Sequence, residues 1–392
     1  MKQPVDLRAS AAARRRRLFS LLSDDIGAVV SCTTNNKVYL GGYHSMTHDI
    51  APEYLSAVVA TRDKAALVTS ASDAGPALEL LGDPELVFRY GTFYFESSEA
   101  SGPLGFDLPG YPDFYAALAR ALKTIAPPHQ KVGVDRSRGD MLDAVVAESC
   151  GAGNAVDVTQ TILASRRLKL PEEVELIRQA TQLVEAGLEV VAAEARVGMT
   201  EFDLAAMLTQ KIVVGAGVPR LISVTTGPRS GLADAYPTLR RIAAGELIRI
   251  DASCFVGGFS SDMARTFVIG EPSKLAQTRY EAIGAGLEEE LSRVKAGARV
   301  GDVFDAAVQT VRAQGIPTYR RHHCGHGLGI GGYEYPIVVE NSDAIMEAGM
   351  CFCLETPYYQ LGWGGMMVED TILVTERGYE PITTIPRKLY VL

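Results

Sequence analysis

The chain has 392 residues, of which 47% are hydrophobic and 22% charged, and its formal net charge is −9. This length is enough for two or three domains with real apolar cores. The acidic balance argues against a nucleic-acid-binding surface, since such surfaces are basic. No segment approaches the roughly 18 apolar residues of a membrane span, and the apolar piece 18–22 is too short for a signal peptide. We interpret the arginines at 14–17, which precede it, as a solvated helix face.

The cysteines are interpreted as reduced core thiols. They form no CxxC pair and lie mostly in apolar segments, a usage typical of a cytoplasmic protein. Three of them lie beside candidate ligands described below, so thiol ligation or redox chemistry is the alternative to simple packing. The six cysteines are at positions 32, 150, 254, 324, 351 and 353.

Residues 1–165 alternate between helical and strand patterns, which predicts one α/β domain with a mixed sheet flanked by helices. The loop 41–49 carries Tyr43, His44 and His48 but has no other metal-ligand spacing. The expected helices are an arginine-rich one at the start and others around 75–82, 112–125 and 139–149. The expected strands are 26–30, 37–40, 57–60, 66–68, 86–90 and 131–134.

Residues 166–392 form the second predicted domain, after a linker at about 160–170. Pro171 suits the first turn of a long helix, because its missing N–H would be unpaired there anyway. Thr200 with Asp203 resembles a capping box. The segments 197–208 and 296–311 both place a glycine turn before an amphipathic helix, which indicates two αβ halves related by a pseudo-two-fold axis.

The stretch 321–336, RHHCGHGLGIGGYEYP, contains half of the chain's six histidines, His322, His323 and His326. Its glycines allow a backbone to approach a ligand closely, although they weaken regular structure. Imidazoles in such a setting add little to a core, so the stretch is interpreted as a site. The alternative is a glycine-rich turn with surface histidines.

Four carboxylates interrupt apolar strand-like segments on either side of this stretch. Asp251 and Asp262 belong to one predicted hairpin, and Glu355 and Glu369 to another. A charge in such a segment is costly unless it is paired or bound to a cation. Two hairpins and one imidazole would provide a mostly oxygen ligand set, which suits manganese, iron or cobalt. Because four converging carboxylates repel one another, a two-metal site is the natural expectation.

The order of these residues resembles the five-ligand signature of the methionine aminopeptidase, aminopeptidase P, prolidase and creatinase family, the pita-bread metallopeptidases. The matching strings are IDAS, SSDMARTF, GHGLG, ETPYY and VEDTILVTERG. The resemblance implies an α/β (α+β) protein, with a creatinase-type N-terminal domain over 1–165 and a pita-bread catalytic domain over 166–392. It also implies a homodimer and two divalent metal ions, manganese first, with iron, cobalt or zinc as alternatives.

The resemblance also implies roles for the five ligands. Asp262 and Glu369 match bridging carboxylates, Asp251 matches a ligand of one metal, and His326 with Glu355 match ligands of the other. Glu355 would in addition be the general base that takes a proton from the attacking water.

Two further histidines in the stretch receive different interpretations. His322 matches a histidine that supports the site or contacts substrate, whereas His323 is interpreted as structural.

Three positions depart from the family's pattern. Tyr333 stands where the family usually has a histidine that donates a hydrogen bond to the substrate, and a tyrosine can donate to an oxyanion as well. Asp234 stands where a second histidine is usual, and it would bind a cationic group. Met367 replaces a frequent arginine. An altered substrate and simple drift both remain open.

By resemblance, Tyr43, His44 and His48 line the substrate pocket of a neighbouring subunit; the alternative is an ordinary polar surface loop. The function favoured is an Xaa-Pro-type aminopeptidase or dipeptidase acting on short peptides. The alternatives are a hydrolase of a small non-peptide C–N bond, similar to creatinase or ectoine hydrolase, and a non-catalytic peptide-binding module. Neither a nucleic acid nor a membrane is expected as a partner.

Overall fold

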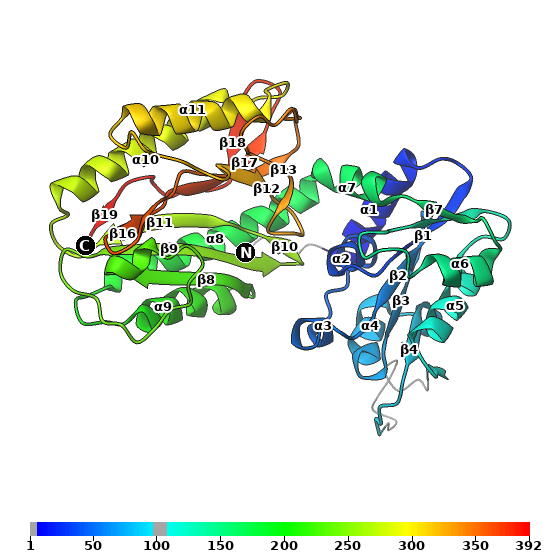
Figure 1. Cartoon of the computed structure of the whole chain (residues 1–392). Helices are drawn as coiled ribbons and strands as arrows, with labels where there is room; N and C mark the ends of the chain where they lie inside the picture. Colours follow the sequence, from blue (N-terminus) through cyan, green and yellow to red (C-terminus); the bar gives the residue numbers. More distant parts are fainter. Residues whose placement is uncertain (1–5, 97–107) are drawn as a thin grey trace. The chain divides into compact units, whose positions relative to one another are not determined.

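The computed structural model describes residues 6–96 and 108–392 (Figure 1). The chain divides into two compact units, Met1–Arg166 and Arg167–Leu392. Among the described helices, none is both long and apolar enough to cross a membrane.

The first unit is built on a seven-stranded mixed sheet in the order β5-β4-β3-β2-β1-β6-β7. Strand β2 pairs antiparallel with both β1 and β3, and the outer pairs are parallel. Helices α5 and α6 cover one face and enclose an apolar core with it. The strands are β1 (Ile26–Ser31), β2 (Ala57–Ala60), β3 (Ala65–Ser70), β4 (Val87–Tyr90), β5 (Gly110–Tyr111), β6 (Lys131–Val134) and β7 (Ala155–Asp157). The helices are α1 (Leu7–Leu21), α2 (Thr34–Gly41), α3 (Met46–Ile50), α4 (Ala74–Leu81), α5 (Phe114–Ile125), α6 (Asp143–Cys150) and α7 (Thr159–Arg167).

Two expectations for this unit are wrong. Residues 37–40, expected as a strand, lie in α2, because Thr33 accepts a hydrogen bond from the Asn36 N–H at its start and Gly42 closes it at a φ of 73°. These local end signals outweigh the strand-like Val-Tyr-Leu triplet. The expected linker at 160–170 is mostly the helix α7.

The expectation of a solvated arginine face on α1 is also wrong for two of the four arginines. Arg14 is fully buried and donates from Nε to the carbonyl of Tyr39 (2.6 Å) and from Nη2 to that of Val38 (3.1 Å). Arg15 donates to the carbonyl of Leu40 (2.8 Å). The last carbonyls of a helix lack intrahelical partners and carry partial negative charge. The two guanidinium groups therefore cap the C-terminal end of α2.

We expect Arg14→Met to destabilise the first unit by about 2–4 kcal/mol, because it removes the buried hydrogen bonds to the carbonyls of Tyr39 and Val38. The matched control is Arg16→Met on the same helix, where the side chain is exposed and the cost should stay within about 0.5 kcal/mol. Urea-unfolding midpoints measure both. Equal midpoints for the two variants would contradict the capping role.

The second unit contains a ten-stranded sheet whose main path runs β10-β9-β11-β17-β14-β12-β13. Strands β8, β18 and β19 pair with β9, β17 and β11. The strands are β8 (Val218–Thr226), β9 (Leu247–Val256), β10 (Phe259–Ser260), β11 (Met263–Val268), β12 (Gly325–Gly327), β13 (Glu334–Ile337), β14 (Cys351–Glu355), β17 (Glu369–Val374), β18 (Tyr379–Pro381) and β19 (Tyr390–Val391). A separate small hairpin joins β15 (Tyr358–Gln360) to β16 (Gly364–Met366).

Two helix pairs complete this unit, one for each half of the sheet. Helices α8 (Pro171–Glu194) and α9 (Glu201–Val214) share a core with β8, β9 and β11. Helices α10 (Lys274–Arg293) and α11 (Val300–Ala313) share another with β14 and β17. Pro171 opens α8, and the Thr200–Asp203 capping box opens α9, both as predicted. The two αβ halves of the predicted fold class are present.

The two halves meet at a short junction between β11 and β17. One backbone register pair joins these strands, Ala264 with Glu369. Arg265, fully buried, reinforces the junction by donating from Nη1 to the carbonyl of Glu369 (2.6 Å) and from Nη2 to Asp370 Oδ1 (2.7 Å). The register at this junction decides which side chains face one another.

Candidate metal centre

Strand register brings the predicted ligands to one face of the sheet. Asp251 pairs with Ala264, Ala264 with Glu369, and Glu369 with Glu355. Residues directly opposite in a sheet point to the same side, as do residues two apart along a strand. Asp262 lies two residues before Ala264, and His326 pairs with Cys353, two residues before Glu355.

All five predicted ligands therefore converge. We call them the ligand cluster: Asp251, Asp262, His326, Glu355 and Glu369.

Three members of the ligand cluster are close enough to hold one cation. Asp262, His326 and Glu369 each offer a donor atom, and these atoms all lie within 4.8 Å of one another. His326 Nε2 lies 3.8 Å from Asp262 Oδ2. All three residues are at most 7% exposed.

The other two members flank this trio and are each contacted by cationic or imidazole groups. Arg249 Nη1 lies 3.5 Å from Asp251 Oδ2. Glu355 Oε1 lies 2.7 Å from His323 Nε2 and 3.4 Å from Arg321 Nη2.

Without a cation, the crowding of buried carboxylates disfavours their ionised forms. Burial first, and then the charges of Asp251 and Glu355, raise the pKa of Asp262 well above its usual range. Burial, and then the charges of Asp262 and Asp251, raise the pKa of Glu369 well above its usual range. Burial raises the pKa of Asp251 to about 7, although Arg249 opposes the shift. The negative charge of the ligand cluster is therefore only partly balanced by positively charged groups of the chain.

Glu355 behaves differently from the other carboxylates. Its burial opposes ionisation, but the hydrogen bond from His323 and the charge of Arg321 outweigh burial and lower its pKa. Glu355 is thus the carboxylate of the cluster that its surroundings hold ionised, which is the state a general base needs.

The residues present fit a bound divalent cation. Buried oxygens on three of them, Asp251 Oδ1, Asp262 Oδ1 and Glu369 Oε2, accept no hydrogen bond from any described residue. His326 Nδ1 lies 3.1 Å from the carbonyl of Gly327, so donation there leaves the Nε2 lone pair facing Asp262. Metal-binding histidines are usually fixed in this way. Orphaned buried oxygens and an oriented imidazole are the donor set that a hard or borderline metal requires.

The structure places His323, rather than His322, against the ligand cluster. His323 bonds Glu355, whereas His322 is exposed and its Nδ1 lies 3.1 Å from His323 Nδ1. His323 therefore contacts a predicted ligand directly, and the roles assigned to His322 and His323 stay predictions. The segment 321–325 has no regular period before Gly325, so the sequence carried no signal for the direction of either ring.

Tyr333 covers His326, the predicted histidine ligand. Its ring stacks on His326 with centroids 3.7 Å apart and an interplanar angle of 24°. Its hydroxyl lies 3.3 Å from His323 Nε2, and the side chain stays 62% exposed. The Tyr333 hydroxyl therefore lies beside His323, the imidazole that contacts Glu355, and is open to solvent. This position is compatible with the predicted donor role.

Arg249 is a site residue that the sequence reasoning missed. It lies two residues before Asp251 on the same face of β9 and is fully buried. It donates to the carbonyls of Ser230 (3.2 Å), Leu232 (2.7 Å) and Ala233, and so fixes the loop that leads into Asp234. A same-face arginine two residues before a ligand was the available signal.

Asp234 and Met367, two of the positions that depart from the family's pattern, lie in different environments. Asp234 is exposed, and its charge contributes to raising the pKa of Asp251, so it lies on that side of the cluster. Met367 is buried, and its sulfur lies 3.7 Å from the hydroxyl of Tyr359. The Tyr359 ring in turn carries the guanidinium groups of Arg249 (5.3 Å) and Arg321 (5.8 Å).

The loop 41–49 of the first unit is a folded polar cluster. Tyr43 is buried, and its hydroxyl donates to Asp73 Oδ1 (2.6 Å), while Ser45 Oγ donates to Asp73 Oδ2 (2.7 Å). His44 is partly exposed and pairs with Asp49 at 2.7 Å. His48 is buried, and burial, followed by the charge of Lys37, lowers its pKa. The structure thus gives Tyr43 a packing role, and the role of the loop towards a second subunit stays a prediction.

The cysteines near the site are buried, and burial raises the pKa of Cys351 to about 12. The candidate metal trio includes no thiol. Packing, the favoured interpretation, accounts for their environment.

Comparisons with known proteins agree with this fold. The model of metallopeptidase family M24 matches residues 175–376. A putative dipeptidase, YkvY, of Bacillus subtilis is 27% identical over 265 residues, which is 67% of this chain and 72% of that protein. An uncharacterized peptidase of Staphylococcus haemolyticus is 30% identical over 241 residues, 61% of this chain and 68% of that protein.

Solved structures show the same fold along nearly the whole chain. An X-Pro aminopeptidase from Thermotoga maritima superposes with a TM-score of 0.78 at 21% identity, covering 97% of this chain and 99% of that one. A prolidase from Pyrococcus furiosus superposes with a TM-score of 0.72 at 20% identity, covering 94% and 99%.

The two αβ halves define the pita-bread fold class, and the buried acidic trio between them is a candidate metal centre. The chain belongs to metallopeptidase family M24.

We expect Asp262→Asn and Glu369→Gln to reduce metal binding, because each removes a charge and an oxygen donor from the trio. Metal content after dialysis, measured by plasma mass spectrometry, should fall and the apparent affinity should weaken about tenfold or more. Asp343→Asn, at an exposed carboxylate of the same unit, is the control and should retain full content. Unchanged metal content in both cluster variants would show that the ion lies elsewhere.

A buried carboxylate outside the ligand cluster predicts that the stability of the folded protein depends on pH. Glu290 on α10 is fully buried, and neither of its oxygens has a partner among the described residues. Burial, and then the charge of Glu355, raises its pKa well above the usual value. The folded state therefore binds this proton more tightly than the unfolded state, so stability falls as pH rises above about 4.3, the unfolded value.

Glu290→Gln removes this titration. Its melting temperature should equal that of the wild type near pH 4 and exceed it by about 3 °C or more at pH 8. Glu289→Gln, which loses only a surface pair with Arg293, should show no such pH-dependent gain. Parallel melting curves for Glu290→Gln and the wild type at every pH would refute the assignment.

Proposed function

We propose that the chain is a dinuclear-metal-dependent peptidase that cleaves short peptides of the Xaa-Pro type. The observation that carries the proposal is the buried trio Asp262, His326 and Glu369, with Asp251 and Glu355 beside it on one face of the sheet. Relatives with dipeptidase, prolidase and X-Pro aminopeptidase activities in their names support the substrate class. Manganese is the first candidate metal, with iron, cobalt or zinc as alternatives.

Bound metal ions supply a nucleophilic water at neutral pH and polarise the scissile carbonyl. The chain's own residues do the rest. Glu355, held ionised by His323 and Arg321, accepts the proton of the attacking water. The Tyr333 hydroxyl donates a hydrogen bond to the oxygen that gains charge. Asp234 binds a cationic group of the substrate.

A second candidate is the hydrolysis of a small non-peptide C–N bond. It is favoured by Tyr333 and Asp234, which stand where the family usually has histidines, because polar contacts in a site decide which ligand is rejected. Release of proline from Xaa-Pro dipeptides by the purified, metal-loaded protein would support the first candidate. Turnover of small amides with inert dipeptides would support the second. Full activity after exhaustive chelation would contradict both.

We expect Glu355→Gln to lower kcat by about 10²–10⁴, the usual contribution of a positioned general base. The amide is nearly the same size, so the melting temperature of the metal-free protein should stay close to that of the wild type. Glu340→Gln, at an exposed position of the same unit, is the control and should keep the wild-type rate. A Glu355→Gln enzyme that turns over normally would remove the base from the mechanism.

Tyr333→Phe tests the donor. We expect kcat to fall about tenfold or more with little change in KM, because the lost hydrogen bond strengthens only as charge develops. Tyr335→Phe, an equally exposed neighbour, should leave both constants unchanged. A wild-type kcat for Tyr333→Phe would assign the ring to packing against His326.

The remaining assignments rest on the resemblance and on supporting features. We propose that residues 1–165 form a creatinase-type domain and 166–392 the catalytic domain, in line with the compact units. We propose a homodimer in which His44 and His48 reach the substrate of the second subunit. Free cysteines at all six positions support a reduced, cytoplasmic compartment.

A further inference from the structure

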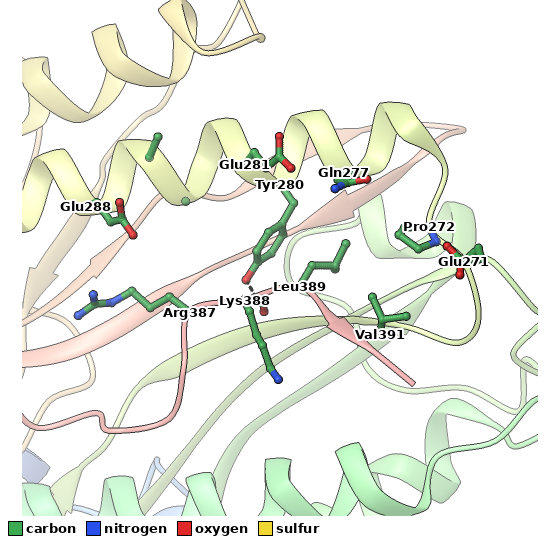
Figure 2. A pocket seen from close by; sticks show the side chains of 12 residues that line it. Glu271, Pro272, Gln277, Tyr280, Glu281, Glu288, Arg387, Lys388, Leu389 and Val391 are labelled. Carbon is green, nitrogen blue, oxygen red and sulfur yellow. Dashed lines mark hydrogen bonds between the residues drawn. The ribbon is translucent and has the colours of Figure 1, made fainter.

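The second unit contains a cleft that the peptidase site does not use. We call it the α10 cleft: it has a volume of about 550 Å³ and lies between one face of α10 and the C-terminal segment 387–391 (Figure 2). Its volume is within the range of small-molecule sites, roughly 300–1,000 Å³. None of its lining residues belongs to the ligand cluster.

Small residues of α10 hollow one wall of the cleft. Gly284 and Ala285 lie where the helix faces the C-terminal segment. A Cβ added at Gly284 would meet no atom within 4 Å, so the space above it is open. Glycine is unfavourable inside a helix by about 1 kcal/mol relative to alanine. The helix therefore carries a costly residue at the point where the cleft is hollowed.

The two walls of the cleft carry opposite charges. Glu281 and Glu288 lie on α10 and Arg387 lies on the facing segment, whereas the Lys388 side chain points away from α10 and its Nζ lies 5.1 Å from the centroid of the Tyr390 ring (Figure 2). No ion pair joins the two walls among the residues that the structure describes. Between them, Leu389 and the Gly284–Ala285 surface form an apolar floor.

We propose that the α10 cleft binds a small zwitterion, an amino acid or short peptide with a free amine and a free carboxylate. The ammonium group would meet the glutamates of α10, and the carboxylate would meet the Arg387 guanidinium. The apolar floor would take the aliphatic side chain. Separated walls of opposite charge with an apolar floor are complementary to this class of ligand and not to a singly charged one.

The cleft is linked to the ligand cluster by a short chain of ion pairs. Arg387 Nε donates to Asp370 Oδ2, and Asp370 Oδ1 accepts from Arg265 Nη2 at 2.7 Å. Arg265 also donates to the carbonyl of Glu369 (2.6 Å), and Asp370 is the residue that follows Glu369.

A carboxylate bound in the cleft competes with Asp370 for Arg387. The zwitterion is therefore an inhibitor that loosens the strand end presenting Glu369. Under the proposed function, its class is that of the enzyme's own products and substrates, so this regulatory role rests on that function. The binding itself does not.

Titration calorimetry of the metal-loaded protein tests the binding. The probes are L-proline and L-leucine in one arm and D-Leu-D-Pro in the other, which separates amino acids from peptides as the ligand. We expect saturable binding with a Kd of about 1 mM, as befits so small a ligand. N-acetyl-leucine and leucinamide, which each lack one charge, should bind at least about threefold more weakly.

Variants tie the binding to the cleft. Glu281→Gln/Glu288→Gln should weaken it about three- to tenfold, whereas the charge-matched Glu340→Gln/Glu376→Gln, at exposed positions elsewhere, should not. Gly284→Leu should abolish binding by filling the open space while favouring the helix, and Gly284→Ala should retain it. No saturable binding by any probe, or binding that survives both Gly284→Leu and the double glutamate variant, overturns the site.

The coupling has its own readout. The zwitterion that binds should slow hydrolysis by at least about twofold in the wild type and not in Gly284→Leu, whose rate without effector stays at the wild-type value. Binding without any change of rate overturns the coupling. Absence of Xaa-Pro hydrolysis would instead refute the proposed function, while calorimetry still reports on the cleft.

Discussion

The second unit is organised around the repulsion between four buried carboxylates on one face of its sheet. Asp251, Glu369 and Glu355 are joined by register through Ala264, so none of them can turn away without breaking the strand pairing. A fold that forces such groups together must have their charges neutralised, either by cations or by protons. The raised pKa values of Asp262 and Glu369 show that the chain alone does not compensate fully. Divalent metal ions bound to these carboxylates would supply the missing positive charge.

The arginine and histidine side chains that balance the carboxylates are distributed unevenly among them. This difference separates the roles of the carboxylates. Arg321 and His323 serve Glu355, which stays ionised. Arg249 lies beside Asp251, but most of its N–H groups donate to carbonyls of the loop Ser230–Ala233. Among the residues that the structure describes, no lysine or arginine pairs with Asp262 or Glu369, and each keeps an oxygen without a hydrogen-bond partner. These two carboxylates belong, with His326, to the trio whose donor atoms all lie within 4.8 Å of one another.

The opposite face of the same strands is neutralised within the chain. Asp370 follows Glu369 and so points away from the cluster, where it is held by Arg265 and Arg387. Arg265 also bonds the backbone of Glu369 and thereby secures a junction with one register pair. Buried ion pairs of this kind are weak evidence for stability, but they fix geometry. Here they fix the end of β17 that presents Glu369, a predicted ligand, and they extend to the wall of the α10 cleft.

The ligand cluster could be read from the sequence because its signal is local: carboxylates that interrupt apolar strands are costly, and histidine beside glycine adds little to a core. The fold class followed from the same motifs, and helix ends such as Pro171 and Thr200 from their capping chemistry. Tertiary packing alone decided the rest. It buried Arg14 on the end of α2, turned His323 rather than His322 towards Glu355, and brought Arg249 under the loop before Asp234. Each depends on a partner distant in the chain or on a ring direction in an irregular segment, and neither periodicity nor propensity records such contacts.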